Sequence, residues 1–417
     1  MLYAIVVVCL LAGWPISVRA QDWKAQLAKR GATVTVVYGG SGFSELAGGV
    51  QRAETYSGDL NIELSLDGEQ LFRRSGLTLF IDGLWIHGGQ PSALVGDAQG
   101  VSNLSATSKV TLYECWFQYN SFGNRFSVLA GRYDLNSEFY RLQSAGLFLN
   151  SSFGIGPEFS GSGLEGPSIF PDTSVGARIA FKPVPNVVVR GAVLGGVPID
   201  RPDGSVSLFK SGDGLLLVSE AAFLNRTARS DRMGKVRFRI GRASGLPPYD
   251  DKIAVGGWYY TATFDDLNKV EPNGKPVEHR GSGGVYALAD ATLLRSRTDP
   301  ARRVAGFVEA GLGDGRIDRF GSYLGAGLVG TGLLSRRPMD ELGLAVAIAH
   351  NGSSYVDQQR RLGLGTTASE TAIEVTYLAP ITSWLAVQPD FQYVIHPNTD
   401  VAVANGRAIQ LRFEATF

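Results

Sequence analysis

The sequence is poor in cysteine, in histidine and in long apolar segments. It has two cysteines, four histidines and, after residue 20, no run of about 18 apolar residues that would predict a transmembrane helix. Cys9 falls in a predicted signal segment, which leaves Cys115 alone, so no intramolecular disulfide is expected. The scattered histidines predict neither a metal cluster nor a catalytic triad, and no cofactor is expected.

The chain also lacks an excess of charge of either sign. It contains 39 Lys and Arg residues and 39 Asp and Glu residues. Removal of residues 1–20, whose only charged side chain is Arg19, leaves 38 against 39 and a net charge of −1. Nucleic-acid-binding proteins carry a basic excess. No nucleic-acid partner is therefore expected.

The first 20 residues have the features of an export signal. Residues 2–18 are apolar, and Val18-Arg19-Ala20 has the small-x-small form of a cleavage site. The basic residues that usually precede the apolar run are missing. We predict a cleaved signal peptide over 1–20 and a mature chain beginning at Gln21; the alternative is a permanent N-terminal anchor.

The last eleven residues alternate between two faces. Ile409, Leu411, Phe413 and Phe417 fall on one side and polar residues on the other, which predicts a β-strand. An amphipathic strand ending in Phe is typical of the last strand of an outer-membrane barrel. We therefore expect a bacterial outer-membrane protein that contacts lipid and lipopolysaccharide. The barrel-assembly machinery is the expected partner of the strand ending at Phe417.

Similar alternation recurs along the whole chain and predicts an all-β protein. Because single-chain bacterial barrels have even strand numbers, the pattern predicts one transmembrane antiparallel β-barrel of about 16 strands over residues 21–417. The sequence has 17 candidate strands, so one of them is expected not to be a strand, and the first candidate is the weakest. The candidates are 33–38, 58–67, 77–85, 110–119, 126–134, 174–182, 187–194, 215–224, 235–241, 254–263, 283–293, 304–311, 323–330, 342–349, 371–379, 384–395 and 407–417.

The connection 135–173 is much longer than the others and rich in glycine. A loop of this length in a compact protein is normally functional. In a barrel, we expect it to fold inward and narrow the lumen.

Several motifs resemble the carbohydrate-selective porin family typified by the bacterial OprB channels. The likeness extends over about residues 31 to 417 and rests on these stretches: 384–393 with His396-Pro397, 112–116, 131–136 with Phe139, 257–261 and 337–343. It implies a 16-stranded outer-membrane barrel, not an enzyme, that passes monosaccharides and similar polyols by diffusion. Monomer and homo-oligomer both remain open, since the apolar outer face can contact lipid or another subunit.

A sugar channel needs polar lumen groups that replace water around hydroxyls without binding tightly. Strand alternation puts Glu114 and Trp116 on one face, opposite Tyr113, and puts Arg132 and Asp134 on one face, opposite Tyr133. The family likeness implies that the acidic and basic residues of these two motifs project into the channel, which supports the same assignment. The alternative is a structural ion-pair network that anchors the inward loop, and both roles can hold. Weaker candidates from neighbouring loops are Asp97, Arg125, Glu138 and Arg141.

Further arginines qualify the predicted solute. Arg178, Arg190, Arg237 and Arg239 also fall on predicted lumen faces. Unpaired arginines would favour anions, so a general or organic-anion diffusion pore is the second hypothesis. An outer-membrane phospholipase using residues 350–353 is a distant third. The GxGxxG pattern at 325–330 is attributed to small residues on a strand, because no helix follows it.

Overall fold

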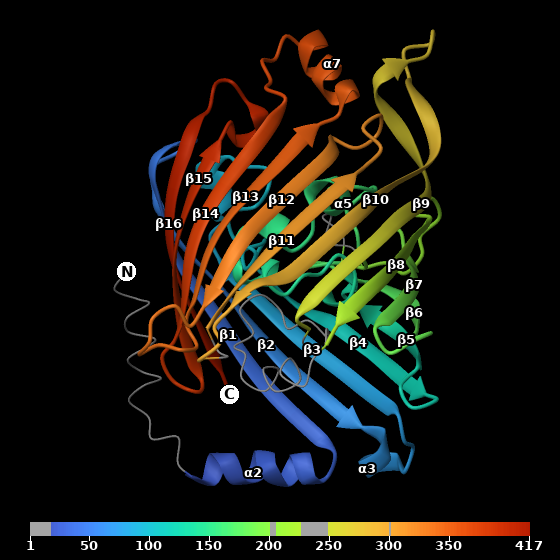
Figure 1. The fold of residues 1–417 in the computed structure, drawn as a ribbon. Helices are drawn as coiled ribbons and strands as arrows, with labels where there is room; N and C mark the ends of the chain where they lie inside the picture. Colours follow the sequence, from blue (N-terminus) through green and yellow to red (C-terminus); the bar gives the residue numbers. More distant parts are fainter. Residues whose placement is uncertain (1–17, 201–205, 227–248, 300–301) are drawn as a thin grey trace.

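Sixteen strands form one closed antiparallel ring in the computed structural model, which describes residues 18–200, 206–226, 249–299 and 302–417 (Figure 1). Strands adjacent in sequence are adjacent in the ring, and β1 pairs with β16 to close it. The predicted barrel is therefore confirmed. The strands are β1 (Ala32–Gly49), β2 (Glu54–Asp67), β3 (Leu77–Gly88), β4 (Lys109–Ser121), β5 (Phe126–Tyr133), β6 (Ser174–Phe181), β7 (Val187–Gly195), β8 (Leu215–Asn225), β9 (Asp251–Val270), β10 (Pro276–Arg295), β11 (Arg303–Leu312), β12 (Phe320–Thr331), β13 (Glu341–Asn351), β14 (Ser369–Pro380), β15 (Leu385–Ile395) and β16 (Ala404–Thr416).

The first strand corrects one expectation. The segment 33–38, expected to be surplus, belongs to β1, which has 18 residues and pairs with both β2 and β16. Glycines such as Gly39 and Gly40 occupy both faces of β1, so its alternation is weak in the sequence. The candidate strand 235–241, with Arg237 and Arg239, lies outside the described residues.

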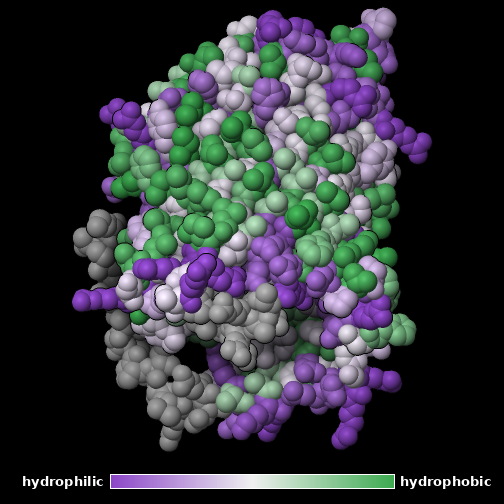
Figure 2. Space-filling model, viewed as in Figure 1, coloured by the Kyte–Doolittle hydropathy of each residue, from purple (hydrophilic) through white to green (hydrophobic). Residues whose placement is uncertain are grey.

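The two faces of the wall differ as the alternation predicts. On β6, the outward Ile179 and Phe181 are 57% and 48% exposed, whereas the inward Arg178 is 2% exposed. On the outer surface seen in Figure 2, hydrophobic residues form a belt between two hydrophilic ends. None of the helices within the described ranges combines the length and apolar composition needed to span a bilayer.

The two ends of the barrel carry different connections. The end with α2 and α3 has short turns such as 122–125, 182–186 and 381–384, and the end with α7 has the long loops 89–108, 134–173, 196–214 and 352–368 (Figure 1). Most of the connection 226–250 lies outside the described residues. The helical elements are α2 (Val18–Lys29), α3 (Gly68–Phe72), α4 (Pro91–Val95), η1 (Leu135–Ser137), η2 (Ala145–Leu147), η3 (Ser151–Phe153), α5 (Pro157–Ser160), α7 (Ser353–Arg361) and η4 (Pro397–Thr399).

The hydrophobic core lies inside the barrel, between the wall and the 134–173 loop. Phe139, Phe148 and Phe159 of this loop are at most 1% exposed. The Phe159 ring stacks on Trp258 of β9, with ring centres 4.2 Å apart. The predicted inward fold of the loop is therefore confirmed.

Two sequence patterns receive a structural explanation. Residues 325–330 lie within β12, so their glycines belong to a strand. His350 lies near the end of β13, and Ser353 begins α7.

Candidate functional site

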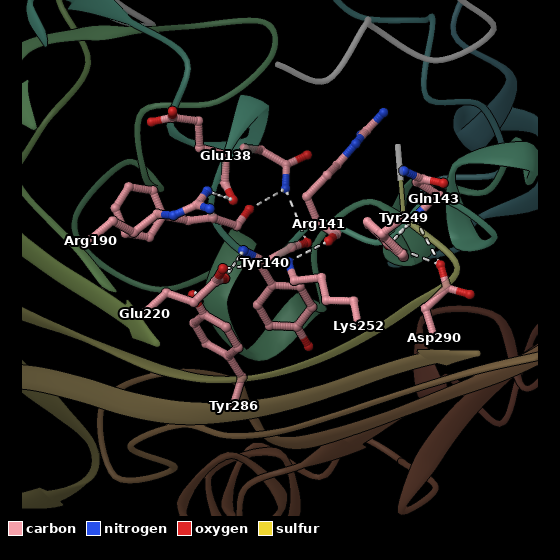
Figure 3. A network of polar contacts seen from close by, with 12 residues as sticks. Glu138, Tyr140, Arg141, Gln143, Arg190, Glu220, Tyr249, Lys252, Tyr286 and Asp290 are labelled. Atoms are coloured by element: carbon pink, nitrogen blue, oxygen red, sulfur yellow. Dashed lines mark hydrogen bonds and ion pairs between the residues drawn. The ribbon is translucent and has the colours of Figure 1, made fainter. Parts of the chain in front are cut away.

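The 134–173 loop occupies one side of the lumen because polar wall side chains bind its backbone. Glu220 of β8 and Lys252 of β9 hold it at Tyr140 and Arg141 (Figure 3). The Tyr140 N–H donates to Glu220 Oε2 at 3.0 Å, and Lys252 Nζ donates to the Arg141 carbonyl oxygen at 2.8 Å. The Arg141 side chain leaves this network and lines the lumen cavity.

Two further wall carboxylates dock the next part of the loop. Asp290 of β10 accepts hydrogen bonds from the N–H groups of Gln143 and Ser144, both at 3.0 Å. Glu374 of β14 accepts from the N–H groups of Leu149 and Asn150 at 2.6 and 2.9 Å. Each of these side chains satisfies two consecutive backbone N–H groups of the loop, which would be costly to leave unpaired in the interior. The loop is therefore fixed against β8–β14 at several points.

The remaining space forms a cavity of about 990 Å³. Its wall consists of inward residues of β1–β8 and β16, and the inward segments near 98–104 and 134–170 form its other side. Within the described chain, seven acidic and seven basic side chains line it. The acidic residues are Asp59, Glu63, Asp82, Glu114, Asp134, Glu138 and Glu414, and the basic residues are Arg125, Arg141, Arg178, Lys182, Arg190, Arg226 and Arg412.

The predicted residues Glu114, Trp116 and Asp134 meet at this cavity. Glu114 Oε1 accepts from the Asp134 N–H at 2.9 Å and from Trp116 Nε1 at 3.3 Å. Tyr113 OH donates to Asp134 Oδ2 at 2.5 Å. The Trp116 indole stacks with the Phe80 ring, with centres 5.0 Å apart. The cavity therefore combines carboxylate acceptors with an aromatic surface.

The position of Tyr113 corrects the expected face assignment. Asp82 pairs with Glu114 and Gly83 pairs with Leu112, so Tyr113 is an extra residue in β4. Such a β-bulge changes the phase of the alternation. Tyr113 therefore lies inside the barrel at 1% exposure, where the alternation had placed it outside.

Arg132 and Tyr133 correct the assignment on the next strand. Gly131 pairs with the inward Trp116, so Tyr133, two residues further on, lines the cavity and Arg132 does not. The Arg132 guanidinium instead donates to Asp200 Oδ2 at 2.7 Å and to Thr173 Oγ1 at 2.8 Å. It connects β5 to the long loop 196–214, outside the cavity.

Glu138 and Arg178 form an ion pair in the cavity wall. Arg178 Nε and Nη2 donate to the two Glu138 carboxylate oxygens at 2.7 and 3.0 Å. Arg190 Nη1 donates to the Glu138 backbone oxygen at 2.6 Å. Because Glu138 belongs to the inward loop, these bonds tie the loop to β6 and β7, and all three residues line the cavity.

The last two predicted residues differ in position. Arg125 lines the cavity from a short turn, and its Nη2 donates to the Pro183 oxygen at 2.9 Å. Asp97 does not line it; burial raises the pKa of its carboxyl to about 7, and the negative charge of Glu370 adds to the rise. Asp97 therefore belongs to the packing of the 89–108 loop.

The sequence reading missed several lining residues. Asp59, Asp82 and Arg412 occupy inward positions of strands that it recognised, so the same alternation rule could have found them. Within the described ranges, no three His, Cys, Asp or Glu side chains form a group that could hold a metal ion.

A comparison with known families matches residues 51–417 to the family described as carbohydrate-selective porin, OprB family. The chain belongs to this family. Porin B of Pseudomonas aeruginosa is 23% identical to it over 194 residues, which cover 42% of each chain. The match therefore spans less than half the length of that curated relative.

Solved structures show the same fold as this OprB-family porin. The high-pH structure of Pseudomonas putida OprB has a TM-score of 0.81 at 19% identity and covers 95% of this chain and 97% of that one. An anion-selective porin from Comamonas acidovorans has a TM-score of 0.54 at 9% identity, covering 93% and 99%. At these identities, the likeness establishes the fold alone. Family and fold together indicate a porin of the bacterial outer membrane.

Proposed function

We propose that this porin passes monosaccharides and similar polyols by passive diffusion through the cavity beside the inward loop. The observation that carries the proposal is the equal number of acidic and basic side chains in the described cavity lining. Carboxylates accept hydrogen bonds from hydroxyl groups and guanidinium groups donate to them. A neutral polyhydroxylated solute can use both, whereas an ion would be repelled by half of the charges.

Local geometry supports the same solute class. The stacked Phe80 and Trp116 rings give the cavity an apolar surface beside the Glu114 carboxylate. Sugar rings have hydroxyl groups at their edges and C–H groups on their faces, so a mixed lining suits them. Since Glu138 and Arg178 already bind one another, they can exchange hydrogen bonds with a solute without holding it long.

An organic-anion porin is the second candidate, because basic residues gather on one sector of the wall. Arg178 of β6, Arg190 of β7 and Lys182 in the turn between them all line the cavity there. Reversal potentials in a salt gradient distinguish the two candidates. A sugar porin with balanced charges is weakly ion-selective, whereas an anion porin is strongly selective for anions.

Current recordings in planar bilayers test the first candidate directly. Added glucose is expected to reduce the ion current in a saturable manner, and an organic anion at the same concentration is expected to have little effect. Liposome swelling with a panel of sugars gives the permeation rates. Block by anions alone would contradict the proposal.

We further propose how the chain reaches its membrane. Residues 1–20 act as a cleaved signal, and the strand ending at Phe417 is the part recognised by the barrel-assembly machinery. Phe417 exchanges two backbone hydrogen bonds with Val36 of β1 and its ring stacks on Trp384, which supports its role in closing the barrel. N-terminal sequencing of the purified protein tests the cleavage, with Gln21 as the expected first residue.

A further inference from the structure

The barrel wall contains a lysine that is completely buried. The side chain of Lys252 of β9 has no exposed surface, and neither has that of Glu220 of β8, whose Oε1 lies 3.4 Å from Lys252 Nζ. Replacing such an ion pair by apolar residues is often neutral or stabilising. Barrel stability alone therefore does not explain why this ion pair is present in the wall.

Both members of the pair bind the same part of the inward loop. Glu220 Oε2 accepts the Tyr140 N–H at 3.0 Å, and Lys252 Nζ donates to the Arg141 carbonyl at 2.8 Å (Figure 3). Tyr286 OH donates to Glu220 Oε2 at 3.0 Å and fixes that carboxylate. One donor and one acceptor on the wall thus determine the position of two consecutive loop residues.

The second of these residues projects into the solute cavity. The Arg141 side chain extends away from the network in Figure 3 and lines the cavity with Glu114 and Asp134. A guanidinium group has five donors in a fixed arrangement, so its value to a solute depends on its position. The Arg141 backbone is held by the wall, and this sets where those donors lie.

We propose that Lys252 and Glu220 are positioning residues that fix Arg141 in the channel and thereby determine its solute preference. The inference rests on the proposed passage of sugars and specifies how the same site acquires its selectivity. Lys252 does not line the cavity, so it acts on the solute only through Arg141.

A double-mutant cycle tests this mechanism. Lys252→Met, Arg141→Ala and the double variant are compared for the glucose concentration that gives half-maximal current block and for the reversal potential in a KCl gradient. Lys252→Met is expected to raise the half-blocking concentration about tenfold in the parent protein and less than about twofold when Arg141 is already alanine. Lys275→Met, in the exposed turn after β9, is the matched control and is expected to change neither quantity.

Two further measurements make the result decisive. Lys252→Met combined with Glu220→Gln removes both charges, so no unpaired carboxylate remains buried, and heat-modifiable migration in SDS gels verifies the barrel. Equal effects of Lys252→Met with and without Arg141 would overturn the positioning role. If glucose blocks no variant, the proposed sugar passage fails, while non-additive changes in reversal potential still support the coupling of Lys252 to Arg141.

Discussion

Asp290 docks the inward loop at Gln143 and Ser144, and its replacement by alanine tests whether this docking sets the channel width. The carboxylate accepts hydrogen bonds from both N–H groups at 3.0 Å, from Ser144 Oγ at 2.7 Å and from Tyr249 OH at 3.0 Å. The Gln143 N–H also donates to Tyr249 OH at 2.8 Å and keeps that partner. The Ser144 N–H and hydroxyl lose the acceptor that holds them to the wall.

The expected loss follows from these bonds. Leaving a buried donor unsatisfied costs about 1–3 kcal/mol, so the loss of the acceptor for the Ser144 N–H and hydroxyl should weaken loop docking by roughly 2–6 kcal/mol. The low end of this range is expected, because both hydrogen bonds are only part-buried. The strand ladder of β10 remains intact, because the substitution changes only an inward side chain. A docking loss of about 2 kcal/mol corresponds to about 30-fold more frequent opening of the loop.

Hydrogen–deuterium exchange and single-channel conductance measure this opening. The amides of residues 139–150 should exchange about 30-fold faster or more, and the conductance should rise and become noisier. Glu278→Ala, at an exposed position of the same strand, is the control and should leave both unchanged. Unchanged exchange in Asp290→Ala would refute the view that wall carboxylates hold the loop.

Three other predictions follow from the site. Burial raises the pKa of the Glu158 carboxyl from 4.5 to about 7, so the docked loop binds a proton that the released loop does not. Loop docking should therefore weaken by up to about 3 kcal/mol as the pH rises from about 4.5 to 7, and level off above pH 7. Hydrogen–deuterium exchange measured across this pH range should show the change in the parent protein and lose it in Glu158→Gln. Glu114→Gln should change the block of ion current by glucose, because Glu114 lines the cavity. Arg132→Ala should leave this block unchanged and increase proteolysis of the 196–214 loop, since Arg132 binds Asp200 outside the cavity. Loss of glucose block in Arg132→Ala would contradict this placement. Phe417→Ala should reduce the heat-modifiable fraction in outer membranes, because it removes the ring that stacks on Trp384, and full assembly would argue against that role.

Local alternation predicted the wall because each strand side chain has only two directions. On β6, Ile179 and Phe181 point outward and Arg178 inward, as the pattern predicts. β1 was underrated because Gly39 and Gly40 carry no side chain that could show a face. The sequence therefore supplied the strand positions and the fold class, except where glycine removed the signal.

Face assignment failed on β4 and β5, where the inward side depends on how neighbouring strands pair. Tyr113 lies inside the barrel because β4 has one extra residue opposite Asp82 and Gly83 of β3. This β-bulge is a property of the register between the two strands. Arg132 was misplaced because Gly131 takes the inward position opposite Trp116. The register between two strands cannot be predicted from the residue types or the spacing within one of them.

The sequence by itself determined a barrel with an inward loop and a family likeness, since alternation and loop length are properties of contiguous residues. Only the tertiary structure decided which side of the lumen stays open. The loop docks on Glu220, Asp290 and Glu374, which are 80 to 225 residues away from their loop partners. The docked loop contributes Arg141 to the lining of the cavity that remains, together with Glu114 and Asp134. The docking contacts form because closure of the barrel places strands that are distant in the sequence around the same loop.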